Sequence, residues 1–134
     1  MNRYVTVGLS MLAGAVLGGA AIQTLHAQAK PPVYYVAEID VTNPEAYGKE
    51  YAPKARAMIE AAGGHFVAIG GAAGAGAKEM VVFDGEAPKR VNVQVWGDMA
   101  KLKAWRASSE YQALRKLGDQ YAKFRAYAVE GLAQ

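Results

Sequence analysis

The sequence contains no cysteine and only two histidines, His26 and His65, among its 134 residues. Without cysteine no disulfide supports the fold, so stability must come from the core and from contacts between copies. His26 lies in the atypical first thirty residues, which leaves His65 alone, with no carboxylate at metal-ligand spacing. A zinc or iron site is not supported, and a haem would depend on His65. We expect no metal and no cofactor.

The sequence also lacks a strong excess of charge. Its 15 Lys and Arg residues face 12 Asp and Glu residues, a net charge of +3. Basic side chains gather in the helical region 101–116, but acidic residues interleave there, which favours a solvated helix face over a nucleic-acid surface. We expect no nucleic-acid partner. Large core-forming residues are few as well, because Ala supplies much of the 52 % hydrophobic share and a further 15 residues are Gly.

The first thirty residues differ from the rest of the chain. Arg3 precedes an uncharged Gly/Ala/Leu-rich run over residues 5–22, and Ala27-Gln28-Ala29 places small residues where a signal peptidase reads. We predict a signal peptide over residues 1–29, cleaved after Ala29 or after Ala27, and one mature domain over residues 30–134. The alternative is an uncleaved membrane anchor, the one membrane contact that we expect. Cleavage predicts a periplasmic or secreted protein.

The first half of this domain predicts a strand, a helix and a second strand. Residues 33–41 alternate in side-chain character as a strand does. Asn43 then offers an N-cap before Pro44, and the helix that starts there ends at Gly63-Gly64. Pro53 should kink this helix or restart it. Its apolar stripe consists of Tyr47, Tyr51, Ala55, Met58 and Ala62. The second strand is expected over residues 65–70.

The middle of the chain is rich in glycine and alanine over residues 70–77. A phosphate-binding loop would need a helix after these glycines, whereas the strand-like segment 80–83 follows, so a flexible hairpin connection is favoured. Alternation over residues 91–96 predicts the third main strand. Its valines form one face, and Asn92, Gln94 and Trp96 form the other.

The last third predicts two helical segments and a closing strand. Asp98 can cap a helix on which Met99, Leu102 and Trp105 step by three. Ser109 can cap the next segment, whose stripe runs from Tyr111 to Tyr121. A strand over residues 124–129 closes the domain. The order βαββαβ predicts the α+β class and a ferredoxin-like antiparallel sheet with both helices on one face.

Several segments, in order, resemble a bacterial family called domain of unknown function 1330. They are residues 33–39, 43–47, 63–66, 88–91 and 105–114, and the segment Ser108-Ser109-Glu110-Tyr111-Gln112 is the most distinctive. The resemblance covers residues 33–132. Ile69 stands where family members often carry an arginine, so an anion-binding role for that position is not transferred, and Arg90 is the matching basic position at a strand start.

This resemblance implies the dimeric α+β barrel superfamily, in which two ferredoxin-like subunits bring their sheets together. We therefore expect a homodimer. Its interface would be a mixed sheet face carrying Tyr34, Val36, Glu38, Asn92, Gln94 and Trp96, which an isolated subunit would leave partly uncovered. Relatives in the superfamily include cofactor-free monooxygenases, lactone isomerases and haem enzymes, but a shared fold does not transfer a function.

Five residues are candidates for a site. His65 has a pKa suited to proton transfer near neutral pH, and burial of Glu38 would raise its pKa toward that of a general base. Arg90 could contact an anion, and Trp105 and Tyr111 could form ligand walls, although each residue also has a plain structural role. Ser108 and Ser109 have no base at recognisable spacing, so nucleophilic catalysis is unsupported.

Three functions stay open at this point. The first is a site for a small organic or anionic molecule between helices and sheet. The second is a cofactor-independent enzyme of the monooxygenase or isomerase type, by analogy with the superfamily. The third is a non-catalytic structural or partner-binding dimer of the cell envelope. The sequence does not decide whether the protein is an enzyme.

Overall fold

An antiparallel sheet with four strands organises the domain in a computed structural model that describes residues 30–72 and 76–134. The strands are β1 (Val33–Val41), β2 (His65–Gly71), β3 (Arg90–Trp96) and β4 (Ala122–Glu130). They lie in the order β2-β3-β1-β4. The four main predicted strands are confirmed, with bounds that differ by one or two residues at β2, β3 and β4. The predicted signal segment and its cleavage sites lie outside the described residues.

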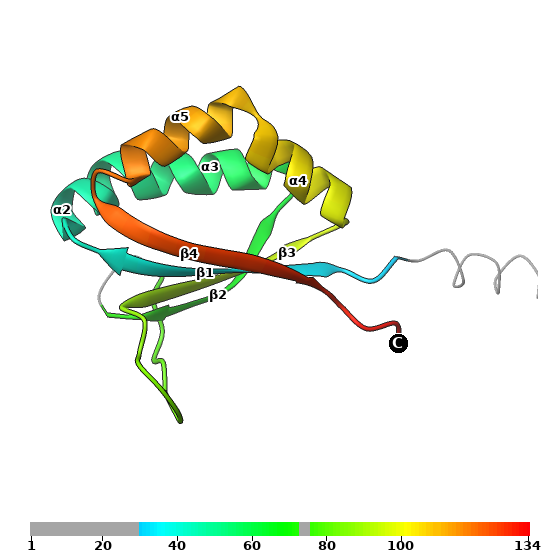
Figure 1. Cartoon of the computed structure of the whole chain (residues 1–134), viewed down its shortest axis with the longest axis horizontal. Coiled ribbons are helices and arrows are strands. Elements are labelled where there is room, and N and C mark those ends of the chain that lie inside the picture. Colours follow the sequence, from blue (N-terminus) through cyan, green and yellow to red (C-terminus); the bar gives the residue numbers. More distant parts are fainter. Residues whose placement is uncertain (1–29, 73–75) are drawn as a thin grey trace, which may run out of the picture. The chain divides into compact units, whose positions relative to one another are not determined.

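Two helical runs cover one face of this sheet (Figure 1). The first connects β1 to β2 and consists of α2 (Pro44–Ala46), η1 (Tyr47–Tyr51) and α3 (Ala52–Ala62). The second connects β3 to β4 and consists of α4 (Met99–Ala107) and α5 (Ser109–Gly118). The βαββαβ order with both helical runs on one face confirms the predicted ferredoxin-like α+β fold. Among the described helices, none is both long and apolar enough for a membrane crossing.

The first helical run contains one wide turn. Asn43 starts the run, since its Oδ1 accepts a hydrogen bond of 3.1 Å from the backbone N–H of Ala46. The predicted irregularity at Pro53 takes the form of the π-helical segment η1 directly before it, because proline has no N–H to donate to the preceding turn. Gly63, at φ 101°, ends the run as predicted. Ile59 is buried in this run although the predicted stripe omitted it, whereas Met58 and Ala62 are partly buried.

The second helical run begins at Asp98, whose carboxylate accepts a 2.7 Å hydrogen bond from the N–H of Lys101. Its restart lies one residue earlier than predicted. Ser108, rather than Ser109, is the N-cap of α5, because Ser108 has the extended backbone of a cap and its Oγ accepts from the N–H of Tyr111. The run ends at Gly118, so Tyr121 lies beyond the helix whose stripe was predicted to include it.

Strand pairing corrects the predicted assignment of sheet faces. Cross-strand partners share a face, and β1 pairs Ala37 with Asn92, Tyr35 with Gln94 and Val33 with Trp96. The polar side of β3 therefore faces the helices together with the apolar side of β1, and Gln94 is only 3 % exposed. The prediction that Asn92, Gln94 and Trp96 share a face with Tyr34 and Glu38 is wrong. Alternation separates two faces of a strand but does not say which one the helices cover.

The sheet face away from the helices is largely apolar. It combines Tyr34 and Val36 of β1 with the β3 valines that pair with that side of β1, and with Tyr127 and Val129 of β4. Val129 is 59 % exposed, and Tyr34 and Tyr127 are also exposed. We call this surface the outer sheet face.

The segment 80–83 does not form the expected strand. Lys78 makes an isolated bridge to Gly70, and the residues after it form a loop that projects from the sheet on the side away from the helices (Figure 1). Phe83 is 89 % exposed there, and Val81 and Val82 are exposed as well. A high β propensity describes how well side chains fit a paired sheet, so without a partner strand it does not produce one.

Candidate functional site

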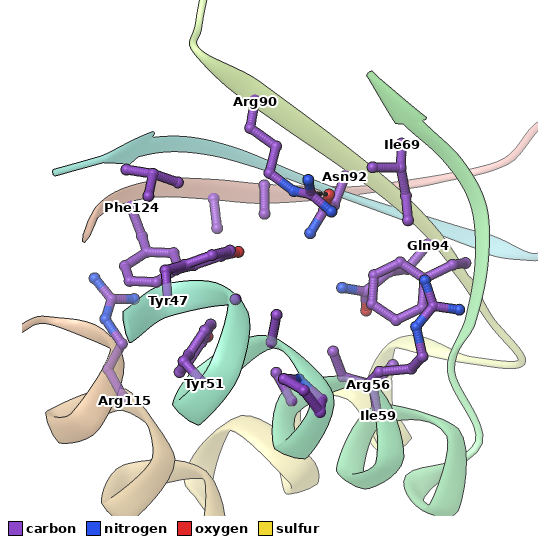
Figure 2. Close-up of a pocket in the computed structure, with 18 of the residues that line it drawn as sticks. Tyr47, Tyr51, Arg56, Ile59, Ile69, Arg90, Asn92, Gln94, Arg115 and Phe124 are labelled. Atoms are coloured by element: carbon purple, nitrogen blue, oxygen red, sulfur yellow. Dashed lines mark hydrogen bonds between the residues drawn. The ribbon is translucent and has the colours of Figure 1, made fainter. Parts of the chain in front are cut away.

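A cavity of about 430 Å³ lies between the sheet and the helices. Figure 2 shows Tyr47, Tyr51 and Phe124 toward one end, and Arg56, Ile59 and Gln94 toward the other. Small side chains leave this space open. They are Ala37 and Ala126 on the sheet side and Gly48, Ala52 and Ala55 on the helix side. Larger residues at these positions would fill the interior, so the Ala-rich composition of the chain has a structural consequence here.

Aromatic rings form much of the cavity wall. Tyr51 lies between Tyr47 and Phe124, with ring centroids 5.1 and 5.5 Å away respectively. Trp105 and Tyr111 meet edge to face at 4.7 Å on the second helical run. Such packing fixes the orientation of the rings. The wall is therefore a preformed apolar surface that suits a flat or apolar ligand.

Three polar side chains stand in a row on the inward face of β3, at Arg90, Asn92 and Gln94. The Nε–H of Arg90 donates to Oδ1 of Asn92 at 3.3 Å, and the indole N–H of Trp96 donates to Oε1 of Gln94 at 3.0 Å. The side chains of Arg90 and Trp96 carry hydrogen-bond donors and no acceptor. Each therefore holds the amide of its partner, Asn92 or Gln94, with the oxygen toward the donor. The row is the main polar feature of an otherwise mostly apolar cavity (Figure 2).

The charged groups that line the cavity are all cations: Arg56, Lys89, Arg90 and Arg115. Nζ of Lys89 lies 2.7 Å from Oδ1 of Asp40, and Nε of Arg115 lies 2.6 Å from Oδ1 of Asp119. Nη1 of Arg56 lies 3.9 Å from Oε1 of Glu60. None of the ion pairs in the described part of the chain includes Arg90. Since Arg90 is only 9 % exposed, it is a buried cation without an acidic partner among these residues. A site of this kind attracts an anion.

Three tyrosines that line the cavity, Tyr35, Tyr47 and Tyr51, are neutral hydroxyls at physiological pH. Burial raises the pKa of Tyr47, and the nearby positive charge of Arg90 opposes this effect without reversing it. Burial likewise raises the pKa of Tyr51 and of Tyr35. Their hydroxyl groups keep their protons and act as hydrogen-bond donors or acceptors, so they add no negative charge that would neutralise Arg90.

Arg106 holds part of the wall in place. Its Nη1 donates to the hydroxyl of Tyr35 at 3.2 Å and to the hydroxyl of Tyr111. Tyr35 lines the cavity on one side and, on the other, an open groove between α4 and β4 that Arg106 also lines. Arg106 therefore holds in place Tyr35, which lies between the cavity and this groove, and Tyr111 of the cavity wall.

The structure brings three of the five candidate residues together. Arg90, Trp105 and Tyr111 line the cavity. Glu38 and His65 do not, because both lie on the side of the sheet that faces away from the helices. Glu38 accepts a hydrogen bond of 2.9 Å from Arg125, and His65 is exposed at the start of β2 opposite Val95.

Most of the polar residues that line the cavity, including Tyr47, Asn92 and Gln94, are not among the five predicted site residues. The signal that could have revealed them was the polar side of the third strand. One face of this strand carries three polar side chains at alternate positions, Arg90, Asn92 and Gln94. If this face is buried, these side chains need hydrogen-bond partners. The prediction from the sequence instead places that face in a dimer contact.

The cavity offers little for metal binding or proton abstraction. Across residues 30–72 and 76–134, no three His, Cys, Asp or Glu side chains are grouped so that they could hold a metal ion. No carboxylate or imidazole is among the described residues that line the cavity. The arrangement is therefore suited to binding an anion by charge and shape rather than to general-base chemistry by a protein group.

A family model described as "Domain of unknown function (DUF1330)" matches residues 32–132. No curated protein matches the chain at a significant level. Among solved structures, the chain is similar to SnoaB, a cofactor-independent oxygenase from Streptomyces nogalater, with a TM-score of 0.53 and 15 % identity over 78 % of this chain and 96 % of SnoaB. It is also similar to RPA0582, a protein of unknown function from Rhodopseudomonas palustris, with a TM-score of 0.52 and 17 % identity over 84 % of this chain and 92 % of that one. At these identities the likeness concerns the fold alone.

Proposed function

The chain belongs to the DUF1330 family, and we propose that its domain binds a small organic anion in the cavity between sheet and helices. The observation that carries the proposal is Arg90, a buried guanidinium that lines the cavity and makes no ion pair among the described residues. A volume of about 430 Å³ falls within the range of roughly 300 to 1,000 Å³ that small-molecule sites occupy.

Charge and shape support the same class of ligand. Taking a guanidinium out of water without a counter-charge is costly, and an anion that enters beside Arg90 offsets this cost. The aromatic walls would then enclose an apolar or aromatic body. We therefore propose an aryl carboxylate, or an anion of similar shape, as the ligand class.

Calorimetric titration with 4-benzylbenzoate, a carboxylate with two aromatic rings, tests this function. We expect Arg90→Gln to weaken binding about 10- to 100-fold, because hydrogen bonds to a charged group contribute roughly 1.5–3 kcal/mol. Arg125→Gln is the matched control, since Arg125 is an arginine whose side chain is 78 % exposed on the outer sheet face. Circular dichroism of both variants checks their folding. Equal affinity of the wild-type protein and a folded Arg90→Gln variant would refute the proposal.

A cofactor-independent oxygenase is the second candidate, and it is supported by the fold similarity to SnoaB. The cavity favours binding over this activity, because the described lining residues include no carboxylate or imidazole that could remove a proton from a substrate. Such an enzyme would need a substrate that enters already ionised. Oxygen uptake with a bound phenolate as the probe would support the oxygenase, and recovery of unchanged phenolate after incubation in air would argue against it.

We further propose a homodimer that forms through the outer sheet face. Tyr34, Tyr127 and Val129 are exposed there beside the β3 valines, and the loop carrying Phe83 projects on the same side. A contiguous apolar surface of this kind is unfavourable in water unless a partner covers it. A second copy is the partner that needs no other component. Light scattering at micromolar concentration should give a dimer mass, and a monomer mass would contradict the proposal.

Export from the cytoplasm is proposed on the sequence of residues 1–29 alone. Intact-mass measurement of protein recovered from the periplasm and the medium should show a mature chain that starts at Lys30 or at Gln28. Detection of peptides from residues 1–27 in the recovered protein would instead support an uncleaved anchor.

A further inference from the structure

The polar row on β3 presents hydrogen-bond donors to the cavity and few acceptors. Oδ1 of Asn92 is engaged by Arg90, and Oε1 of Gln94 is engaged by Trp96. What each amide has left is its NH₂ group. Arginine itself has donors only.

The two amide nitrogens have access to the cavity. Asn92 and Gln94 both line it, and among the described residues neither nitrogen donates to a protein acceptor. The indole N–H of Trp105 is buried away from water and has no hydrogen-bond partner among the described residues. The amide nitrogens of Asn92 and Gln94 are not buried without a partner in this way. Figure 2 shows Arg90 and Asn92 reaching from β3 toward the helices.

We infer that the bound anion carries carbonyl oxygens along one edge, and that its class is an oxo-substituted aryl carboxylate. The carboxylate would pair with Arg90, while Asn92 and Gln94 would donate to a ketone or similar acceptor further along the ligand. This inference rests on the proposed anion binding and adds the pattern of acceptors that the ligand must show.

Strand geometry sets the spacing of these acceptors. The three residues occupy alternate positions on one strand, so their Cα atoms lie about 6.5–7 Å apart from one to the next. One aromatic ring between a carboxylate and a ketone spans a similar distance. Because Nε of Arg90 already lies 3.3 Å from Oδ1 of Asn92, a carboxylate on Arg90 would lie beside this pair. A ketone in the para position can then reach the next donor along β3, the NH₂ group of Gln94.

The matched probes 4-benzoylbenzoate and 4-benzylbenzoate test this inference. They have the same length and charge, and differ only in a ketone that replaces a methylene group. A cavity without free donors would favour the methylene compound, because burying an unpaired carbonyl is unfavourable. We expect the wild-type protein to bind the ketone about 3- to 10-fold more tightly, which corresponds to one neutral hydrogen bond.

Two variants then locate the donor. Asn92→Leu and Gln94→Met each remove one NH₂ group, and the ratio of the two affinities should fall to about one in the variant whose donor meets the ketone. A general change in Arg90 or in packing affects both probes equally and cancels in this ratio. Gln120→Leu is the control, since Gln120 is an exposed amide that does not line the cavity.

The outcomes separate this inference from the proposed function. A wild-type ratio of one or less overturns the inference, and so does a preference for the ketone that persists in both Asn92→Leu and Gln94→Met. In Arg90→Gln both probes should weaken together while the ratio is kept. If Arg90→Gln binds both probes as the wild type does, anion binding by Arg90 is refuted, whatever the ratio. The wild-type ratio tests the inference even if a variant does not fold.

Discussion

Replacing Gly118 with alanine should destabilise the domain by about 1–2 kcal/mol. Gly118 ends α5, and a Cβ atom there would lie 2.6 Å from Cε2 of Tyr51 and 3.0 Å from two further atoms of the same ring. The ring cannot withdraw easily, because Tyr47 and Phe124 flank it. Overpacking of this kind costs about 1–3 kcal/mol. The loss of chain entropy in the unfolded state offsets about 0.4–1 kcal/mol of that cost.

Urea unfolding followed by circular dichroism measures this loss, and Gly97→Ala is the matched control. A Cβ at Gly97 would meet no atom within 4 Å, and Gly97 is not among the glycines with positive φ. The control should therefore keep the wild-type midpoint or exceed it slightly. Because Tyr51 lines the cavity, Gly118→Ala should also weaken binding of 4-benzylbenzoate. Unchanged stability in Gly118→Ala would show that the close packing of α5 against Tyr51 does not constrain the ring.

Four further predictions concern the outer sheet face and the buried Tyr51. Val129→Asp places a carboxylate on the outer sheet face, so sedimentation velocity should show monomers with unchanged probe affinity, and a persistent dimer would count against that interface. Burial raises the pKa of Tyr51 above its ordinary value of 10.0, so the native state holds this proton more tightly than the unfolded state. The stability that this difference contributes is complete below about pH 10 and is lost as the pH rises further. Above pH 10, the urea midpoint of Tyr51→Phe should therefore fall less steeply with pH than that of the wild-type protein. Glu38→Gln should change the free energy of unfolding by less than about 1 kcal/mol, because its partner Arg125 is exposed. Glu38→Gln and His65→Ala should both keep wild-type probe affinity, and a loss in either would show that the sheet face away from the helices contributes to the site.

Local sequence signals predicted the elements of the fold because their causes are local. Asn43 and Asp98 accept hydrogen bonds from the backbone three residues ahead, and Gly63 supplies a left-handed conformation. The predicted N-cap, Ser109, lies one residue after the observed N-cap, Ser108. Either hydroxyl can cap a helix, and the backbone conformation selects between them. The predicted strand over residues 80–83 does not form. Its cause would not be local, because a strand requires a partner that lies elsewhere in the chain.

The candidate site was predicted only in part. Arg90, Trp105 and Tyr111 line the cavity as a ligand site between helices and sheet requires. Glu38 and His65 were chosen for their chemistry, and the pleat of β1 and β2 directs them to the other side of the sheet. Asn92 and Gln94 are polar, and polarity alone predicts a surface position, whereas both line the cavity.

The sequence by itself determined the βαββαβ order, the helix ends and the family, because periodicity, caps and turn residues act over a few positions. Only the tertiary structure decided which side of β3 meets the helices. The register of β1 against β3 places Ala37 opposite Asn92 and Tyr35 opposite Gln94, so small and polar side chains face inward and leave a cavity with a buried arginine. The valines of β3 face outward instead. Hydropathy alone predicts that the valines of β3 face the helices and that its polar side chains face outward. The opposite arrangement is stable only where other groups, or a ligand, complete the hydrogen bonds of the buried polar side chains.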